Sequence, residues 1–181
     1  MKKNQSRRPK TASLTHAAII AALYIVLTFF ANALGLANYA VQVRFSESLT
    51  ILPYFTSAAI PGLFIGCLLS NILTGCALPD IIFGSLATLL GALGSRALRN
   101  HKFLVTLPPV IANMVIVPFV LRFAYGLTFS YQGMDLSIPF YMATVGAGEV
   151  ISCCVLGSIL MKALSPYRQL LFPSDKKTLE K

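Results

Sequence analysis

The sequence lacks the motifs by which several classes of enzyme are recognised. It has no G-x-x-x-x-G-K-[ST] loop, so nothing in it predicts ATP binding of the P-loop kind. Its two histidines, His16 and His101, belong to no H-E-x-x-H or paired-ligand motif, which argues against a metal enzyme. Its four cysteines stand in apolar stretches without a C-x-x-C pair, which is typical of reduced, buried side chains. We therefore expect no enzymatic activity, no metal and no other cofactor.

Charge is also scarce, and it is confined to a few places. The 181 residues are 56% hydrophobic and 12% charged, with a formal net charge of +9. Lys and Arg gather in the first ten residues, around residues 96–102 and toward the C-terminus, with only Arg44 and Arg122 elsewhere. A nucleic-acid-binding protein would spread its basic residues over a folded surface, so we expect no nucleic-acid partner. Basic clusters that flank apolar blocks instead mark the cytoplasmic side of a membrane protein.

Long apolar runs between these clusters predict helices that cross a lipid bilayer. Residues 14–34, 103–125 and 138–163 each have about the twenty residues that a crossing needs. The stretch 46–96 must contain an odd number of crossings to return the chain to the cytoplasmic side, and three fit its length. Its Pro and Gly residues divide it into pieces at 46–58, 60–76 and 79–96, the first of which is short or kinked.

The fold class predicted from these runs is an all-α integral membrane bundle of six transmembrane helices with both termini in the cytoplasm. We expect a six-helix membrane domain at residues 13–165, between a basic cytoplasmic N-terminus (1–12) and a cytoplasmic tail (166–181). No processing site follows the first apolar run, so that run should remain as a membrane anchor. The protein is accordingly expected to be a multi-pass protein of the cell membrane.

Polar residues inside the predicted spans lie mostly in the outer half of the membrane. An ionisable group at a helix centre costs about 2.5–3.5 kcal/mol, so it persists where it meets a partner or a ligand. Several such groups at one depth favour a ligand pocket, although a structural pair of Glu149 with Arg122 or Arg44 is an open alternative. The candidate pocket residues are Arg44, Glu47, Asn71, Asp80, Asn113 and Glu149.

The first predicted span carries small residues one helical turn apart. Ala17 with Ala21, and Ala18 with Ala22, form two overlapping small-x-x-x-small pairs. Such pairs let a second helix approach closely, either inside the bundle or from a membrane partner. The sequence leaves both alternatives open.

Five blocks in the same order resemble one family of membrane proteins. They are VQVRFSESLTILPYF, IPGLFIGCLLSNILTG, PDIIFGSLATLLGAL, PPVIANMVIV and VGAGEVISCCVLG, within about residues 14–163. The chain resembles the QueT family of queuosine-precursor S components, the substrate-binding membrane subunits of energy-coupling factor (ECF) transporters. The resemblance implies a protein that captures a 7-deazaguanine such as preQ1 or preQ0 from outside. It also implies assembly with a transmembrane coupling subunit, the T component, and two ATPase subunits, and delivery of the ligand by reorientation in the bilayer.

The resemblance also implies roles for individual residues. The alanine pairs of the first span would face the coupling subunit, and the loop at about residues 35–45 would help to close the ligand site. A deazaguanine presents N–H and amine donors, for which carboxylates are natural acceptors. The predicted site has Glu149 or Glu47 on the donor edge, Asp80 for a cationic amine, Asn71 and Asn113 on the ring acceptors, Phe45 or Tyr39 stacked on the ring, and Arg44 among them.

Other readings of the same residues remain open. The protein could be an S component of the same architecture for another vitamin or base. It could also be a secondary transporter driven by protons, with Glu149 as the titrating carboxylate. An intramembrane enzyme is disfavoured, because no nucleophile and base share one depth.

Overall fold

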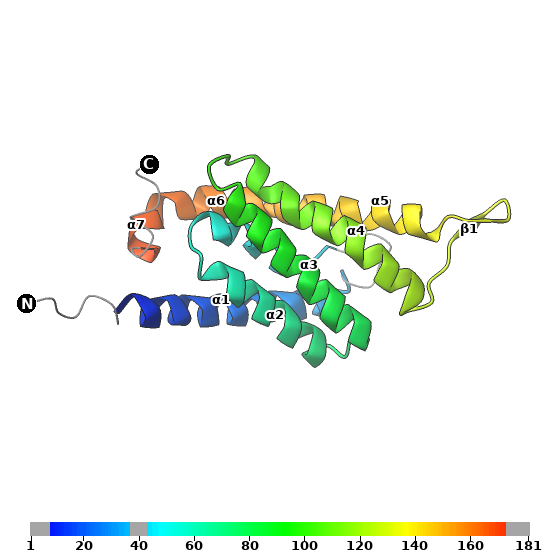
Figure 1. The fold of residues 1–181 in the computed structure, drawn as a ribbon, viewed down its shortest axis with the longest axis horizontal. Coiled ribbons are helices and arrows are strands. Elements are labelled where there is room, and N and C mark those ends of the chain that lie inside the picture. The colour runs from blue at the N-terminus through cyan, green and yellow to red at the C-terminus, as the bar shows by residue number, and fades with distance from the viewer. Residues whose placement is uncertain (1–7, 37–42, 173–181) are drawn as a thin grey trace, which may run out of the picture.

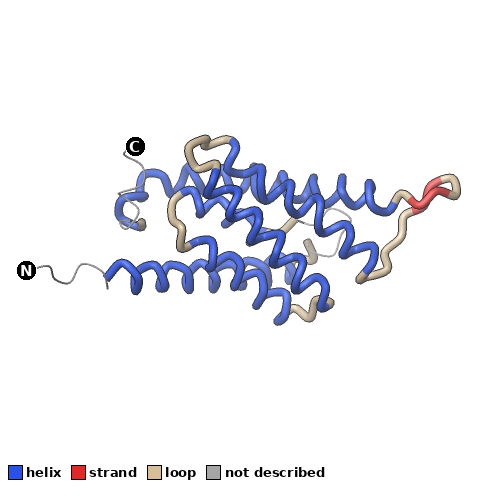
Figure 2. The backbone as a smooth tube through the Cα atoms, in the orientation of Figure 1, coloured by secondary structure: helices blue, strands red, loops and turns tan. Residues whose placement is uncertain are grey.

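The computed structural model describes residues 8–36 and 43–172 and is almost entirely helical. The helices are α1 (Arg8–Ala33), η1 (Phe45–Tyr54), α2 (Ala59–Leu73), α3 (Leu78–Ala97), η2 (Leu104–Thr106), α4 (Leu107–Phe123), α5 (Ser137–Glu149), η3 (Val150–Leu156), α6 (Gly157–Leu164), η4 (Ser165–Tyr167) and α7 (Arg168–Leu171). Two short strands, β1 (Ser130–Tyr131) and β2 (Met134–Asp135), pair antiparallel and form a hairpin at one end of the bundle (Figure 2). The predicted all-α membrane bundle is confirmed.

Within the described residues, four helical stretches are long and apolar enough to cross a membrane. They are Thr11–Ala33, Leu78–Ala97, Leu104–Phe123 and Ser137–Leu171, and α2 is a shorter apolar helix. The chain runs back and forth, so that α1 begins and α7 ends at the same end of the bundle, together with the loop between α3 and α4 (Figure 1). We call this the basic end, because Arg96, Arg99, Lys102, Lys162 and Arg168 belong to it, and the opposite end the hairpin end.

The second predicted segment, expected to be short or kinked, is the ten-residue 3-10 helix η1. Pro53 lies inside it and cannot donate a backbone hydrogen bond. η1 packs against α1, α2, α3, α6 and η3, and most of its side chains are buried. Its carbonyl groups find partners inside the protein: the Arg96 guanidinium donates to the Pro53 carbonyl at 3.0 Å, and the Thr50 hydroxyl to the Glu47 carbonyl at 2.6 Å. Irregular backbone at this depth is stable because protein covers it.

The last predicted span is one continuous helix that contains a π-helical segment. α5, η3 and α6 follow one another without a break from residue 137 to 164, and η3 has π geometry. Ser152 and Cys153 of η3 are buried against η1: the Arg44 backbone N–H donates to Ser152 Oγ at 3.2 Å, and the Thr50 hydroxyl to Cys153 Sγ at 3.4 Å. π segments are frequent at functional sites, so the contact between η3 and η1 is a candidate location for one.

Close packing between α1 and α2 depends on two glycines. A Cβ atom at Gly62 would lie 2.7 Å from the Ala17 carbonyl oxygen, and one at Gly66 would lie 2.8 Å from Tyr24 Cβ and 3.1 Å from Ala21 Cα. Side chains at these positions would push the helices apart. Ala17 and Ala21 of α1 therefore form an internal interface with Gly62 and Gly66 of α2.

We predict that Gly66→Val destabilises the protein by about 1–3 kcal/mol through overpacking. The thermal unfolding midpoint of the purified protein in detergent measures the effect. Ala22→Val is the matched control, because Ala22 is exposed on the other side of α1. Valine forms helices better than glycine and worse than alanine, so without the close contact Gly66→Val would be the milder change. Equal midpoints for the two variants would contradict the described packing.

Candidate ligand-binding site

A polar cavity of about 490 Å³ lies in the half of the bundle that is nearer the hairpin end, which we call the hairpin half. Its volume falls within the range of small-molecule pockets, roughly 300–1,000 Å³. Elements far apart in the sequence meet there, because α1, α2 and α4 end, and α3 begins, at the hairpin end (Figure 1). The lining residues are Thr28, Ala31, Asn32, Arg44, Asn71, Thr74, Cys76, Asp80, Val117, Leu121, Tyr125 and Leu127.

Asp80 is the carboxylate that lines this cavity. It lies in the first turn of α3, where the helix dipole favours a negative charge. The Tyr125 hydroxyl donates to Asp80 Oδ2 at 3.0 Å and accepts from the Ala77 backbone N–H at 3.1 Å. Asp80 Oδ1 is buried and has no hydrogen-bond partner among the described residues. One oxygen is therefore held in place, and the other is buried without a hydrogen-bond partner among the described residues.

Asn71 lies beside Asp80, and both side chains occupy space that a side chain at Gly84 would crowd. A Cβ atom at Gly84 would lie 3.2 Å from Asp80 Oδ1 and 3.3 Å from Asn71 Nδ2, so a side chain there would crowd both polar groups. Sequence reasoning missed Gly84 and Tyr125. Gly84 follows Asp80 by four residues and so lies on the same helix face, which is a signal that the sequence contains.

Arg44, the residue directly before η1, lines the cavity and is half-buried. Asp80 is the opposite charge that acts on it most strongly, and Glu47 also acts on it. Its backbone N–H is tied to Ser152 Oγ of η3. The backbone of this residue is thus anchored to η3, and its side chain is part of the cavity lining.

Two further carboxyl groups lie deeper than the cavity lining. One ligand atom each of Glu47, Glu149 and Cys153 lies within 4.8 Å of the other two; we call these residues the carboxyl cluster. Glu47 is 1% exposed and Glu149 6%. The charge of Arg44 acts on both carboxyl groups, which links the cluster to the cavity.

The carboxyl groups of Glu47 and Glu149 accept hydrogen bonds from neutral groups. The Tyr24 hydroxyl donates to Glu47 Oε1, and the Cys153 thiol donates to Glu149 Oε2 at 3.2 Å. Asn113 of α4 faces Glu149, but its Nδ2 has no hydrogen bond of good geometry within the described residues, and Glu47 Oε2 has none either. The three ligand atoms of the cluster could approach a cation, so the expectation of no metal stays a prediction.

The six polar residues predicted for one pocket therefore form two adjoining groups. Arg44, Asn71 and Asp80 line the cavity, whereas Glu47, Asn113 and Glu149 are buried next to it. The alternative in which Glu149 pairs with Arg122 is wrong, because Arg122 forms a 2.8 Å ion pair with Asp135.

The predicted stacking residues do not line the cavity in the described structure. Phe45 is half-buried, and its ring lies 5.9 Å from that of Phe30 between centroids. Tyr39 lies outside the described residues. The stacking role of either residue stays a prediction.

The two alanine pairs of α1 have different surroundings. Ala17 and Ala21 are buried against Gly62 and Gly66 of α2, so they serve packing within this chain. Ala18 and Ala22 are exposed on the outside of the bundle. Of the four alanines, these two remain available to a membrane partner.

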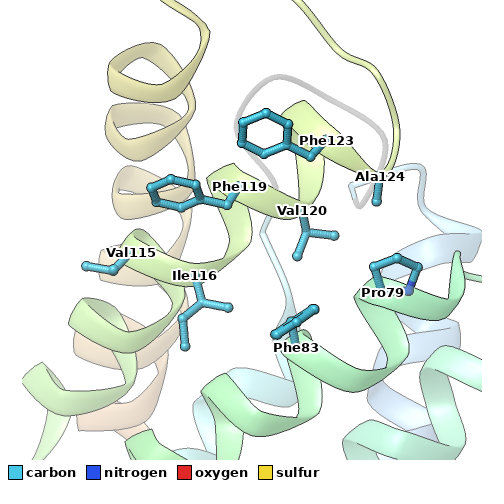
Figure 3. Close-up of a pocket in the computed structure, with 8 residues that line it drawn as sticks. All are labelled: Pro79, Phe83, Val115, Ile116, Phe119, Val120, Phe123 and Ala124. Carbon is cyan, nitrogen blue, oxygen red and sulfur yellow. The ribbon is translucent and has the colours of Figure 1, made fainter.

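A second pocket, of about 400 Å³, lies between α3 and α4 and is apolar (Figure 3). Its lining consists of Pro79, Phe83, Val115, Ile116, Phe119, Val120, Phe123 and Ala124. None of these side chains can form a hydrogen bond with a nitrogenous base, and Phe83, Phe119 and Phe123 are exposed on the bundle surface. This groove suits lipid chains better than a polar ligand.

A bundle of apolar helices around a polar cavity of this size is the architecture of an integral membrane protein that handles a small solute. The chain matches the family model described as QueT transporter over residues 14–166, and it belongs to this family. It is thus a multi-pass membrane protein of a transporter family.

One curated relative is the queuosine precursor transporter QueT of Lactococcus lactis subsp. cremoris, which is 34% identical over 84 residues. The match covers 46% of this chain and 49% of the relative, so the chain spans about half the length of the curated relative that it matches. No solved structure matches the chain.

We predict that Asp135, outside the membrane spans, titrates at unusually low pH. The Ser137 hydroxyl and backbone N–H donate to its carboxylate, and Arg122 pairs with it, which lowers the pKa of Asp135 from 3.8 to about 2. A lowered pKa in the folded state means that these contacts stabilise the hairpin at higher pH and are lost as the pH falls through about 2. The carboxyl carbon resonance of Asp135, followed by NMR, reports the midpoint. Ser137→Ala and Arg122→Gln should each raise it, and an unchanged midpoint in both would contradict the described contacts.

Proposed function

We propose that this protein is the substrate-binding S component of an ECF-type importer that captures a 7-deazaguanine precursor of queuosine. The single observation that carries the proposal is Asp80, buried, with one free oxygen, in a polar cavity that it shares with Arg44 and Asn71. Membership of the QueT transporter family and the name of the Lactococcus lactis relative support the same ligand.

The cavity offers groups that complement such a ligand. Asp80 Oδ1 would accept from the ring N–H and amine donors or pair with an aminomethyl cation, as the carboxylate that the cavity exposes. Arg44 and Asn71 would donate to the acceptors of the ring. Val117 and Leu121 provide apolar walls for its flat faces. Glu149 and Glu47 are not among the lining residues, so a direct contact of either with the donor edge requires the ligand to reach beyond the cavity lining.

The energy for import would come from partner subunits. The chain contains no P-loop motif, so a transmembrane T component and two ATPase subunits would supply ATP hydrolysis. In this proposal the protein sits in the cell membrane with the cavity facing outward and the basic end in the cytoplasm. The membrane domain is residues 13–165, between the basic N-terminus, 1–12, and the C-terminal tail, 166–181. Ala18 and Ala22 would meet the coupling subunit.

We predict that Asp80→Asn weakens binding of the aminomethyl deazaguanine by about tenfold to a hundredfold, because a charged acceptor is lost from a buried site. Calorimetric titration of the purified protein measures the affinity. Asp135→Asn is the matched control: it makes the same chemical change at the hairpin end but outside the cavity lining. Wild-type affinity in Asp80→Asn would refute the assigned site. A different small molecule found by mass spectrometry in the purified protein, together with no deazaguanine binding, would refute the substrate.

We predict that Ala18→Leu and Ala22→Leu prevent co-purification with the coupling subunit and leave deazaguanine affinity unchanged. Larger side chains at this exposed face would hold a partner helix away, whereas the ligand cavity lies on other surfaces. Ala147→Leu, at an exposed alanine on α5, is the control and should keep the complex intact. If both α1 variants assemble normally, the proposed interface is wrong.

The carboxyl cluster supports one other function, a secondary transporter driven by protons. Glu149 and Glu47 are buried ionisable groups of the kind that proton relays use. Uptake into cells separates the two functions. Transport that stops with an uncoupler but continues without the ATPase subunits would select the proton-driven mechanism.

A further inference from the structure

The charges around Arg44 do not balance. Within the described residues, the charge of Arg44 acts on three carboxyl groups, those of Asp80, Glu47 and Glu149. Arg122, the other described arginine of the hairpin half, is already paired with Asp135. If all three carboxyl groups were ionised, this apolar interior would hold two uncompensated negative charges. Such an arrangement is unfavourable, because buried charges are stable only when they are paired.

The carboxyl cluster is the place where a proton can relieve this imbalance. Glu47 and Glu149 are both buried, and carboxyl groups that lie this close share a proton more readily than they ionise together. Among the residues that the structure describes, Arg44 is the positive charge that acts on the pair, and the other groups that face it are neutral. They are Tyr24 of α1, Cys67 of α2, Thr88 of α3, Asn113 of α4 and Cys153 of η3.

Unpartnered polar atoms show that the site is incomplete. Asp80 Oδ1, Glu47 Oε2 and Asn113 Nδ2 are all buried without a hydrogen bond inside the described residues. Leaving such atoms unpaired is unfavourable, so the two oxygens mark positions that a donor or a proton would complete, and the amide nitrogen one that an acceptor would complete. Asp80 Oδ1 belongs to a residue that lines the cavity, and the other two atoms belong to the buried group next to it.

Resting on the proposed function, we infer that the Glu47 and Glu149 pair holds one proton in the empty protein and releases it when a precursor with a primary ammonium binds. The ammonium forms its ion pair with Asp80 Oδ1. Because the ammonium now balances the charge of Asp80, the positive charge of Arg44 balances the newly ionised pair of Glu47 and Glu149. The proton leaves through the cavity to the outer solution, so one positive charge enters the site as one leaves. The site thereby distinguishes the cationic aminomethyl precursor from its neutral nitrile analogue.

Calorimetric titration in buffers of different ionisation enthalpy tests the exchange, because it counts the protons released per ligand. The aminomethyl deazaguanine should release about one proton, and the nitrile analogue about none. The affinity for the aminomethyl compound should rise by up to about tenfold per pH unit between pH 6 and 8, where an alkylamine stays protonated. The affinity for the nitrile should stay constant over this range.

Glu149→Gln is the decisive variant. This variant removes one of the three carboxyl groups on which the Arg44 charge acts, so Asp80 and Glu47 can both stay ionised in the empty protein. The aminomethyl compound should then bind without proton release, and its affinity should not depend on pH. Ala22→Val, at an exposed position on α1 outside the cavity lining, is the control and should keep the proton release and the pH dependence. Infrared spectroscopy of the empty protein gives a second readout that needs no ligand. The carbonyl stretch of a protonated carboxyl group should be present in the wild-type protein at neutral pH and absent in Glu149→Gln.

The outcomes separate this inference from the proposed function. Binding of the aminomethyl compound to the wild-type protein without proton release, or equal proton release with the nitrile, overturns the exchange and leaves the proposed function standing. Absence of the protonated carboxyl band also overturns it, even where the glutamine variant fails to fold. Failure of both compounds to bind overturns the proposed function and the exchange together.

Discussion

The rest of the structure depends on the contact between two irregular helical segments in the middle of an apolar bundle. η1 is a 3-10 helix with a proline inside it, and it is stable because the surrounding helices cover it. η3 is π-helical and buries Ser152 and Cys153 against η1. The Arg44 backbone N–H on Ser152 and the Thr50 hydroxyl on Cys153 fasten them together. The same contact brings Glu47 and Glu149, which are far apart in the sequence, to within a few ångströms.

Arg44 joins the two polar parts of the hairpin half into one electrostatic unit. On one side it lines the cavity beside Asp80, and on the other its charge acts on the carboxyl cluster. A ligand that changes the charge at Asp80 therefore changes the electrostatic balance at Glu47 and Glu149, because charges interact more strongly in a buried site than in water. The proposed exchange of a proton for an ammonium ligand depends on this link through Arg44.

The helices were predictable to within a few residues, because apolar length and Pro and Gly breaks act locally along the chain. The predicted piece at 60–76 is the helix Ala59–Leu73, and the one at 79–96 is Leu78–Ala97. The partners of individual side chains were less predictable. Arg122 meets Asp135 of the hairpin, and Ala17 is covered by Gly62, because both contacts join segments whose relative rotation no periodicity in the sequence fixes.

By itself, the sequence determined that this chain is a helical membrane protein with its polar residues gathered in one half of the bundle. Hydrophobic length and the cost of charge in lipid impose this on any fold that the chain adopts. Only the tertiary structure decided that Asp80 lines the cavity while Glu47 and Glu149 are buried outside its lining. That division depends on how η1 and η3 are turned against each other, and helix rotation is set by packing between neighbours rather than by the hydrophobicity of one segment.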